Sequence, residues 1–190
     1  MKSIVVLFLT LLCTLNVFPV SISFGSEQEN TQTITKVELE EFDLEEMIKA
    51  EDIEDLKLTI YALSGNLLYR IPPKAEQVKI GCDAKVEVTG EELAKNIELF
   101  YKIKSSSLTP RNTESAMYCQ LVYVLESEKN GVLFEADFWY FNEERTVQVN
   151  GVEVDEEQFL YDILLAYSNE VILGWWEPLL HVNYQSEQID

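Results

Sequence analysis

Hydrophobic residues change their spacing several times along the chain, and each change predicts a different element. The first stretch, Ile4 to Phe18, is almost uninterrupted apolar sequence behind a single lysine. It ends at Pro19, and the small residues that follow place a signal-peptidase cut before Phe24 or before Ser26. The run is shorter than the roughly 20 residues that cross a bilayer. We therefore predict that residues 1–25 are a secretory signal peptide rather than an anchor.

Polar and acidic sequence follows the predicted signal peptide. Twelve acidic residues lie between Glu27 and Asp55, against only two lysines. Within this stretch Leu44, Met47 and Ile48 fit one face of a broken amphipathic helix. The acidic leader at residues 26–55 is therefore either a short helix or a mobile arm, and the pattern does not decide between the two.

The pattern changes again at residue 56, where apolar and polar positions begin to alternate as they do in half-buried strands. Strand-like runs follow at residues 56–61, 67–71, 78–88, 116–125, 132–141, 146–149 and 152–154. Lys129–Gly131 and Asn150–Gly151 are typical hairpin turns. Capping sequences at Thr89–Glu92 and Asp155–Gln158 each begin an amphipathic helix, and we expect the first helix to run to about Lys104.

These elements predict an α+β fold, because strands outnumber helices and neighbouring strands are joined by tight turns. The expected architecture is an antiparallel meander sheet with one or two helices packed on one face. We expect residues 56–170 to form this single globular domain. Residues 171–190 are a C-terminal tail whose apolar beginning, Val171 to Trp176, we expect to pack on the domain.

The charge balance narrows the classes of partner. The chain has 34 Asp and Glu against 14 Lys and Arg, a formal net charge of −20. A field of this sign repels phosphate backbones and anionic lipid, so we expect neither nucleic acid nor a membrane surface as a partner. No second apolar run reaches membrane-spanning length, and we expect no membrane span after signal cleavage. We predict a secreted or extracytoplasmic protein, and the absence of an Asn-x-Ser/Thr sequon favours a bacterial source.

Two cysteines, Cys82 and Cys119, follow the predicted signal peptide, and both lie in strand-like runs. In an oxidising compartment the simplest prediction for one pair is a disulfide. The alternative, a catalytic thiol, needs a histidine, and the one histidine is His181 in the tail. These residues are too few for a transition-metal site. No calcium-loop spacing, phosphate-binding glycine loop or serine-hydrolase motif occurs either, so we expect no metal and no cofactor.

The remaining candidates for a functional surface are aromatic and acidic. Phe138–Phe141 is a dense aromatic run, and Trp175–Trp176 is a pair that either packs back onto the sheet or forms an exposed recognition surface. The hypothesis that we favour is a non-enzymatic binding or accessory domain that recognises a protein or a glycan. Its candidate surface consists of Trp139, Trp175, Trp176, Glu51, Asp52, Glu54 and Asp55. Two alternatives stay open: an extracellular hydrolase that uses a pair of carboxylates, and a structural or assembly protein of the cell envelope.

Overall fold

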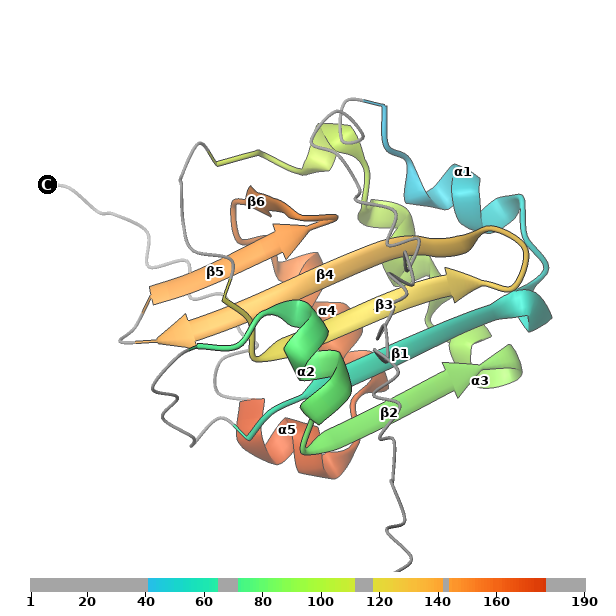
Figure 1. Cartoon of the computed structure of the whole chain (residues 1–190). Coiled ribbons are helices and arrows are strands. Elements are labelled where there is room, and N and C mark those ends of the chain that lie inside the picture. The colour runs from blue at the N-terminus through green and yellow to red at the C-terminus, as the bar shows by residue number, and fades with distance from the viewer. Residues whose placement is uncertain (1–40, 65–71, 112–117, 142–143, 177–190) are drawn as a thin grey trace, which may run out of the picture. The chain divides into compact units, whose positions relative to one another are not determined.

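The computed structural model describes residues 41–64, 72–111, 118–141 and 144–176 (Figure 1). The predicted signal peptide, the strand expected at residues 67–71 and the last part of the tail, with His181, lie outside these ranges. None of the helices in the described ranges combines the length and the apolar character that crossing a membrane requires.

The described residues form a six-stranded sheet in which every neighbouring pair of strands is antiparallel. Its strands are β1 (Leu56–Ala62), β2 (Ala84–Thr89), β3 (Leu121–Ser127), β4 (Gly131–Phe141), β5 (Glu144–Val149) and β6 (Val152–Val154). Their spatial order is β2-β1-β3-β4-β5-β6, so the last four strands follow one another as a meander. The predicted α+β class and antiparallel meander sheet are confirmed.

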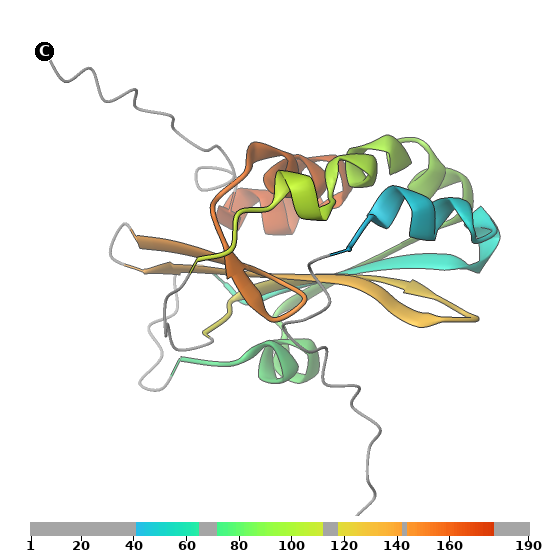
Figure 2. The same cartoon turned by 90° about the horizontal axis from the view of Figure 1, so that it is seen from above.

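Helices lie on both faces of this sheet, as Figure 2 shows. The described helices are α1 (Leu44–Lys49), α2 (Ala75–Gly81), α3 (Gly90–Ala94), α4 (Gln158–Tyr167) and α5 (Glu170–Trp176), with the 3-10 segments η2 (Ile53–Asp55), η3 (Ile97–Lys102) and η4 (Ser105–Ser107). We call the side covered by α1, α3, α4 and α5 the helix face, and the side covered by α2 the α2 face. Helix packing is therefore more extensive than the one or two helices expected on one face.

The β5–β6 turn forms as the sequence predicts. Asn150 and Gly151 have φ of 48° and 75°, the pair of positive φ angles that a type I′ turn requires. The Asn150 side-chain oxygen accepts a hydrogen bond from the Glu135 N–H at 2.9 Å, and the Asn150 N–H donates to the Glu135 carbonyl at 2.9 Å. The turn residue that permits the tight connection thus also fastens it to β4.

The main core lies between the sheet and the helix face. Alternate residues of β4, namely Phe134, Ala136 and Phe138, point into it and are almost completely buried. Tyr123 of the neighbouring strand β3 lies 5.6 Å, between ring centres, from both Phe134 and Phe138. Such offset ring pairs add to the burial of apolar area that holds helices against the sheet.

Helix α1 joins part of the acidic leader to this core. Asp43 caps the helix, because its carboxylate accepts hydrogen bonds from the N–H groups of Glu45 at 3.0 Å and Glu46 at 3.3 Å. Leu44 and Ile48 are buried on the side that faces the sheet. Of the two alternatives for this segment, the short helix is the one observed over its last residues.

One predicted strand is wrong over its first half. Apolar residues two apart at Val78 and Ile80 suggested a continuous strand over residues 78–88, but this region begins as α2 and becomes β2 only at Ala84. In the helix Val78 is fully buried, whereas Ile80 is 88% exposed, so the two apolar residues lie on different sides of a helix of about two turns and not on one face of a strand. The helix starts where the Lys74 N–H donates to the Gln77 side-chain oxygen at 2.9 Å.

The long helix predicted from Thr89 is also interrupted. The Thr89 side chain makes no capping hydrogen bond, and Gly90 has a φ of 53°, which a regular first helical residue does not adopt. Helix α3 ends at Ala94, and Asn96, with φ −129° and ψ 21°, separates it from the 3-10 segment η3. The expected capping box is therefore absent at this position.

The predicted disulfide is absent as well, because Cys82 and Cys119 are both free thiols. They precede β2 and β3 by two residues each, and these strands lie on opposite sides of β1: Ala62 pairs with Ala84 on one side and with Leu121 on the other. Two strand spacings amount to about 10 Å, which exceeds the Cα separation of about 4.4–6.8 Å that a disulfide spans. The Cys119 thiol instead donates to the Leu121 carbonyl at 3.3 Å.

We expect the two thiols to react at very different rates. Cys82 is partly exposed, whereas Cys119 is 1% exposed, and burial, followed by the charge of Asp137, raises the pKa of its thiol well above the ordinary value. Because the thiolate is the reactive form, Cys82 should be labelled at least about tenfold faster than Cys119 in the folded protein. Peptide mapping by mass spectrometry after timed labelling measures both rates. Recovery of a Cys82–Cys119 linked peptide from the native protein would contradict the observed geometry.

Candidate functional site

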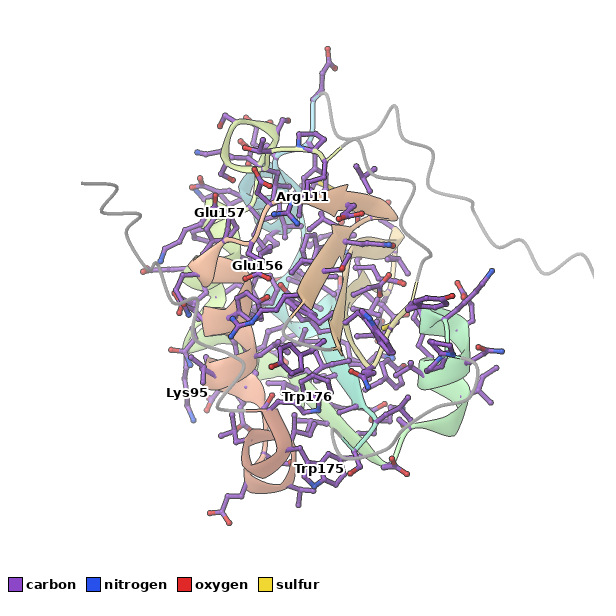
Figure 3. All side chains as sticks on the ribbon, turned by 90° about the vertical axis from the view of Figure 1, so that its left-hand side faces the viewer. Lys95, Arg111, Glu156, Glu157, Trp175 and Trp176 are labelled. Carbon is purple, nitrogen blue, oxygen red and sulfur yellow. The ribbon has the colours of Figure 1, made fainter. Side chains whose placement is uncertain are left out.

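The three tryptophans of the predicted recognition surface occupy different environments. Trp176, at the end of α5, is 3% exposed, and its indole Nε1 donates a hydrogen bond to the Leu63 carbonyl at 3.2 Å (Figure 3). Trp175 is half-buried and packs against the main core. Trp139 follows the core residue Phe138 on β4. The centre of its ring lies 5.6 Å from the centre of the Tyr118 ring. For Trp176 the structure favours packing onto the sheet over an exposed surface.

The acidic residues of the same predicted surface lie beside the β3–β4 hairpin. Glu51 accepts hydrogen bonds from the Ser127 hydroxyl at 2.7 Å and from the Asn130 side-chain amide, and these bonds lower its pKa. Asp55 pairs with Lys129 at 2.5 Å. The two exposed members of the set are Asp52 and Glu54. Two of the four acidic residues, Glu51 and Asp55, therefore hold the β3–β4 hairpin in place.

The structure does not bring the acidic and aromatic parts of this surface together. Ser127, which contacts Glu51, ends β3, whereas Leu121, which lines a pocket with Trp176, begins it. Six residues of extended strand at about 3.3 Å each separate the two places by about 20 Å. The predicted surface is thus two separate regions at opposite ends of the sheet.

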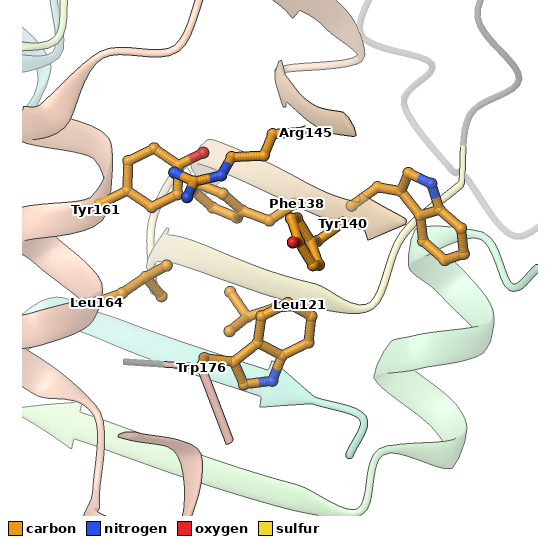
Figure 4. Close-up of a pocket in the computed structure, with 8 residues that line it drawn as sticks. Leu121, Phe138, Tyr140, Arg145, Tyr161, Leu164 and Trp176 are labelled. Atoms are coloured by element: carbon orange, nitrogen blue, oxygen red, sulfur yellow. The ribbon is translucent and has the colours of Figure 1, made fainter. Parts of the chain in front are cut away.

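An open pocket lies between the sheet and helices α4 and α5, close to the pairing of β4 with β5 (Figure 4). The pocket encloses about 20 Å³, room for about one water molecule, and its mouth opens to solvent. Aromatic side chains make up most of its wall, and one arginine contributes a positive charge. The lining residues are Leu121, Phe138, Trp139, Tyr140, Arg145, Tyr161, Leu164 and Trp176.

Arg145 is held in this wall by aromatic and acidic neighbours. Its side chain is 17% exposed, and a guanidinium nitrogen lies 3.8 Å from the Glu156 carboxylate. The guanidinium carbon lies 6.0 Å from the centre of the Tyr140 ring, a cation–π arrangement. Figure 4 shows the guanidinium reaching toward the hydroxyl end of Tyr161.

Burial sets the protonation of the polar groups around this arginine. Burial, reinforced by the charge of Glu156, raises the pKa of Tyr161, and Arg145 opposes the shift only in part. Tyr161 therefore remains a neutral hydroxyl that can donate or accept a hydrogen bond. Burial also raises the pKa of Glu156, and the positive charge of Arg145 counteracts it. The pocket is small, but its mostly apolar wall with a few convergent polar groups has the composition that binding sites usually have.

The hydrolase hypothesis requires two carboxylates that face an accessible cleft. Glu135 and Asp137 lie two residues apart on β4, and their side chains therefore share the α2 face. Burial, followed by the charge of Glu135, raises the pKa of Asp137 to about 8. However, Asp137 is only 8% exposed, and Glu135 is bound to Lys79 at 2.6 Å. The pair has the electrostatic coupling that such catalysis uses but not the access that a polymeric substrate needs.

Within the residues that the structure describes, no three side chains of His, Cys, Asp or Glu come together so that they could hold a metal ion. Comparison with known proteins adds no assignment, since no protein-family model, curated protein or solved structure matches this chain. The case for a function therefore depends on the geometry of the pocket.

Sequence reasoning named part of this pocket and missed its polar groups. Trp139 and Trp176 belonged to the predicted surface, whereas Arg145 and Tyr161 did not. A signal for Arg145 does exist, because it occupies the same face of β5 as the buried residues Val147 and Val149. A basic residue at a core-facing position indicates either a buried ion pair or a ligand contact.

Proposed function

We propose that this protein is an exported, non-enzymatic binding domain that recognises a segment of a partner protein through the pocket around Arg145. The leader pattern at residues 1–25 supports export. The observation that supports recognition is the placement of one largely buried guanidinium in a wall of aromatic rings. Such a wall binds an apolar or aromatic group, and the guanidinium orients a carbonyl or carboxylate attached to it.

The size of the pocket favours a protein side chain as the occupant. Small-molecule sites usually enclose about 300–1,000 Å³, whereas this pocket encloses only about 20 Å³. A drug-sized ligand therefore cannot be enclosed here, whereas one side chain of a protein partner can pack against the mouth of the pocket while the rest of the partner contacts the surrounding surface. Anchoring of one side chain in a pocket is also the way in which a few interface residues provide most of the binding energy.

A glycan is a less suitable ligand for this geometry. Sugar rings need several hydrogen-bond partners for their hydroxyls, together with an aromatic ring face that is open to solvent. Phe138, Tyr161 and Trp176 are 3–4% exposed. The partly exposed rings of the wall are Trp139 and Tyr140, which offer enough surface for one apolar side chain but not for a row of sugar rings. The polar groups of the wall are also few. We therefore keep the glycan as an outcome of the test.

The test uses 3-phenylpropionate, a phenyl ring that carries a carboxylate, as a probe of the pocket. We expect it to shift the NMR signals of pocket residues with a dissociation constant of roughly millimolar, as is usual for so small a ligand. Its uncharged amide should bind about tenfold more weakly, because a charge-assisted hydrogen bond to Arg145 is lost. The Arg145→Met variant should bind acid and amide equally.

Arg111 offers the matched control, because it is a second arginine that pairs with Asp155 at 2.7 Å and does not line the pocket. The Arg111→Met variant should keep the preference for the acid. The proposal fails if 3-phenylpropionate shifts no pocket signal, or if Arg145→Met retains the preference. Shifts of pocket signals by cello- or chito-oligosaccharides, without any by the aromatic acid, would replace the protein partner with a glycan.

A further inference from the structure

We infer that β2 is a self-complementary edge through which two copies of this chain pair antiparallel about a twofold axis. Among the described residues, β2 has a strand neighbour on one side only, β1, and Figure 1 shows it at the border of the sheet. The opposite border is different, because Pro110 forms a β-bridge with Val154 of β6 and the Arg111 N–H donates to the Glu153 carbonyl at 2.8 Å. One edge of the sheet is thus covered by its own chain, whereas no described residue pairs with the outer side of β2.

An open strand edge presents unpaired N–H and C=O groups that can bind another strand. Proteins commonly protect such an edge with charged side chains that repel a second copy. The charges on β2 do not act in this way. Lys85 and Glu87 have opposite signs, share one face of the strand and pair with each other at 2.7 Å.

The order of these charges selects one register for two copies. A twofold axis perpendicular to the sheet places one residue of β2 opposite the same residue of the second copy. When that residue is Val86, Lys85 lies opposite Glu87 of the second copy, and Glu87 opposite its Lys85. Axes at Lys85 or at Glu87 instead place two like charges directly opposite each other. Opposite charges at facing positions stabilise an antiparallel pair, whereas like charges destabilise it.

The other face of β2 suits the same register. Val86 is only partly buried and packs at the margin of the main core, and Ala84 is partly buried beside it. With the axis at Val86, the two valines face each other, and Ala84 lies opposite Val88 of the second copy. The pairing would cover this partly exposed apolar strip and join two six-stranded sheets into one continuous sheet.

The interface would be small, because β2 has six residues. Stable dimers usually bury at least about 1,200 Å² of total surface, so we expect a reversible dimer that forms at high concentration. The net charge of −20 on each chain also opposes association. Measurements at about 0.15 M salt, where the screening length is about 8 Å, reduce this long-range repulsion and leave direct contacts largely intact.

The decisive experiment is a charge swap on β2, followed by sedimentation equilibrium of the purified protein over roughly a hundredfold range of concentration. Lys85→Glu and Glu87→Lys should each weaken dimerisation by about tenfold or more, because each places like charges opposite each other at two symmetry-related positions. The double variant K85E/E87K restores opposite charges and should return the dissociation constant to within about threefold of the original.

Lys49→Glu is the control for net charge, since it reverses one partner of another exposed ion pair, Lys49–Glu45, on α1 and away from the edge. It should change the dissociation constant by less than about threefold. Hydrogen exchange adds a local measurement, and amides of β2 should become better protected as concentration rises. The inference is overturned if the protein stays monomeric throughout, if K85E/E87K fails to restore association, or if Lys49→Glu weakens it as much as Lys85→Glu.

Discussion

Replacing Trp176 by alanine is expected to lower the free energy of unfolding by about 3–5 kcal/mol, the usual cost of removing a large buried aromatic side chain. The indole is 3% exposed and belongs to the main core. Its Nε1 also donates to the Leu63 carbonyl, next to the end of β1. Truncation would leave a cavity between α5 and the sheet and an unpaired carbonyl in it, and both effects act in the same direction.

The neighbouring tryptophan is the matched control for this prediction. Trp175 is half-buried, and Trp175→Ala should cost about 1 kcal/mol because less apolar area returns to water. Chemical denaturation followed by far-ultraviolet circular dichroism compares the two variants without depending on tryptophan fluorescence. Equal losses for both variants, or a loss below about 1 kcal/mol for Trp176→Ala, would mean that α5 does not hold the sheet as described.

This result also affects how the binding proposal is tested. Alanine replacement of both tryptophans would remove part of the predicted contact surface and a core residue at once, so a loss of binding would not distinguish recognition from unfolding. Arg145 allows that separation, because Arg145→Met keeps most of the side-chain volume and removes the charge. A binding defect in Arg145→Met with an unchanged unfolding transition would therefore belong to the pocket.

The parts of the fold that the sequence predicts are those decided by local chemistry. Asn150–Gly151 supplies the positive φ angles of its turn, and β4 alternates over its length, so both could be recognised without knowledge of the rest. The prediction of a strand through Val78 was wrong because a helix of about two turns is too short for its hydrophobic period to be recognised. Packing of Val78 against the α2 face decides between the two structures, and this contact is not local.

The site depends on contacts that no local pattern contains. Leu121, Arg145 and Trp176 meet in one pocket although they are far apart in the sequence. The burial of Asp137 on the α2 face could not be predicted for a related reason. Alternation places Asp137 on the side of β4 away from the main core, which would expose it if no helix covered that side. The sequence pattern predicted a strand where α2 lies, so it did not indicate that a helix covers Asp137.

Asp137 is a buried carboxyl group whose surroundings disfavour its charge. One of its oxygens has no hydrogen-bond partner among the described residues. Glu135 on the same strand, Glu76 and Lys79 of α2, and the thiol of Cys119 are the titratable groups that act on it or are acted on by it. The two glutamates raise its pKa and Lys79 lowers it, but burial is the largest cause, and the resulting pKa is about 8.

Replacing Asp137 by asparagine should therefore stabilise the protein at neutral and alkaline pH. Between about pH 4 and pH 8 the unfolded chain has released this proton and the folded protein still holds it, so the unfolding free energy decreases as pH rises. The decrease amounts to at most about 1.4 kcal/mol per pH unit, and Asp137→Asn removes it. The stability difference between the variant and the original should be small near pH 4, grow by roughly 2–3 kcal/mol between pH 5 and pH 7, and level off above about pH 8.

Chemical denaturation at a series of pH values measures this difference directly, and taking the difference cancels the contributions of the other carboxylates. Asp52→Asn is the control, because Asp52 is exposed and its replacement should change stability by less than about 0.5 kcal/mol at every pH. A constant difference between Asp137→Asn and the original across the whole range would show that the carboxyl is ionised in the folded protein. A difference that grows with pH would instead show that α2 covers a protonated acid and that part of the stability of the fold is lost when this acid ionises.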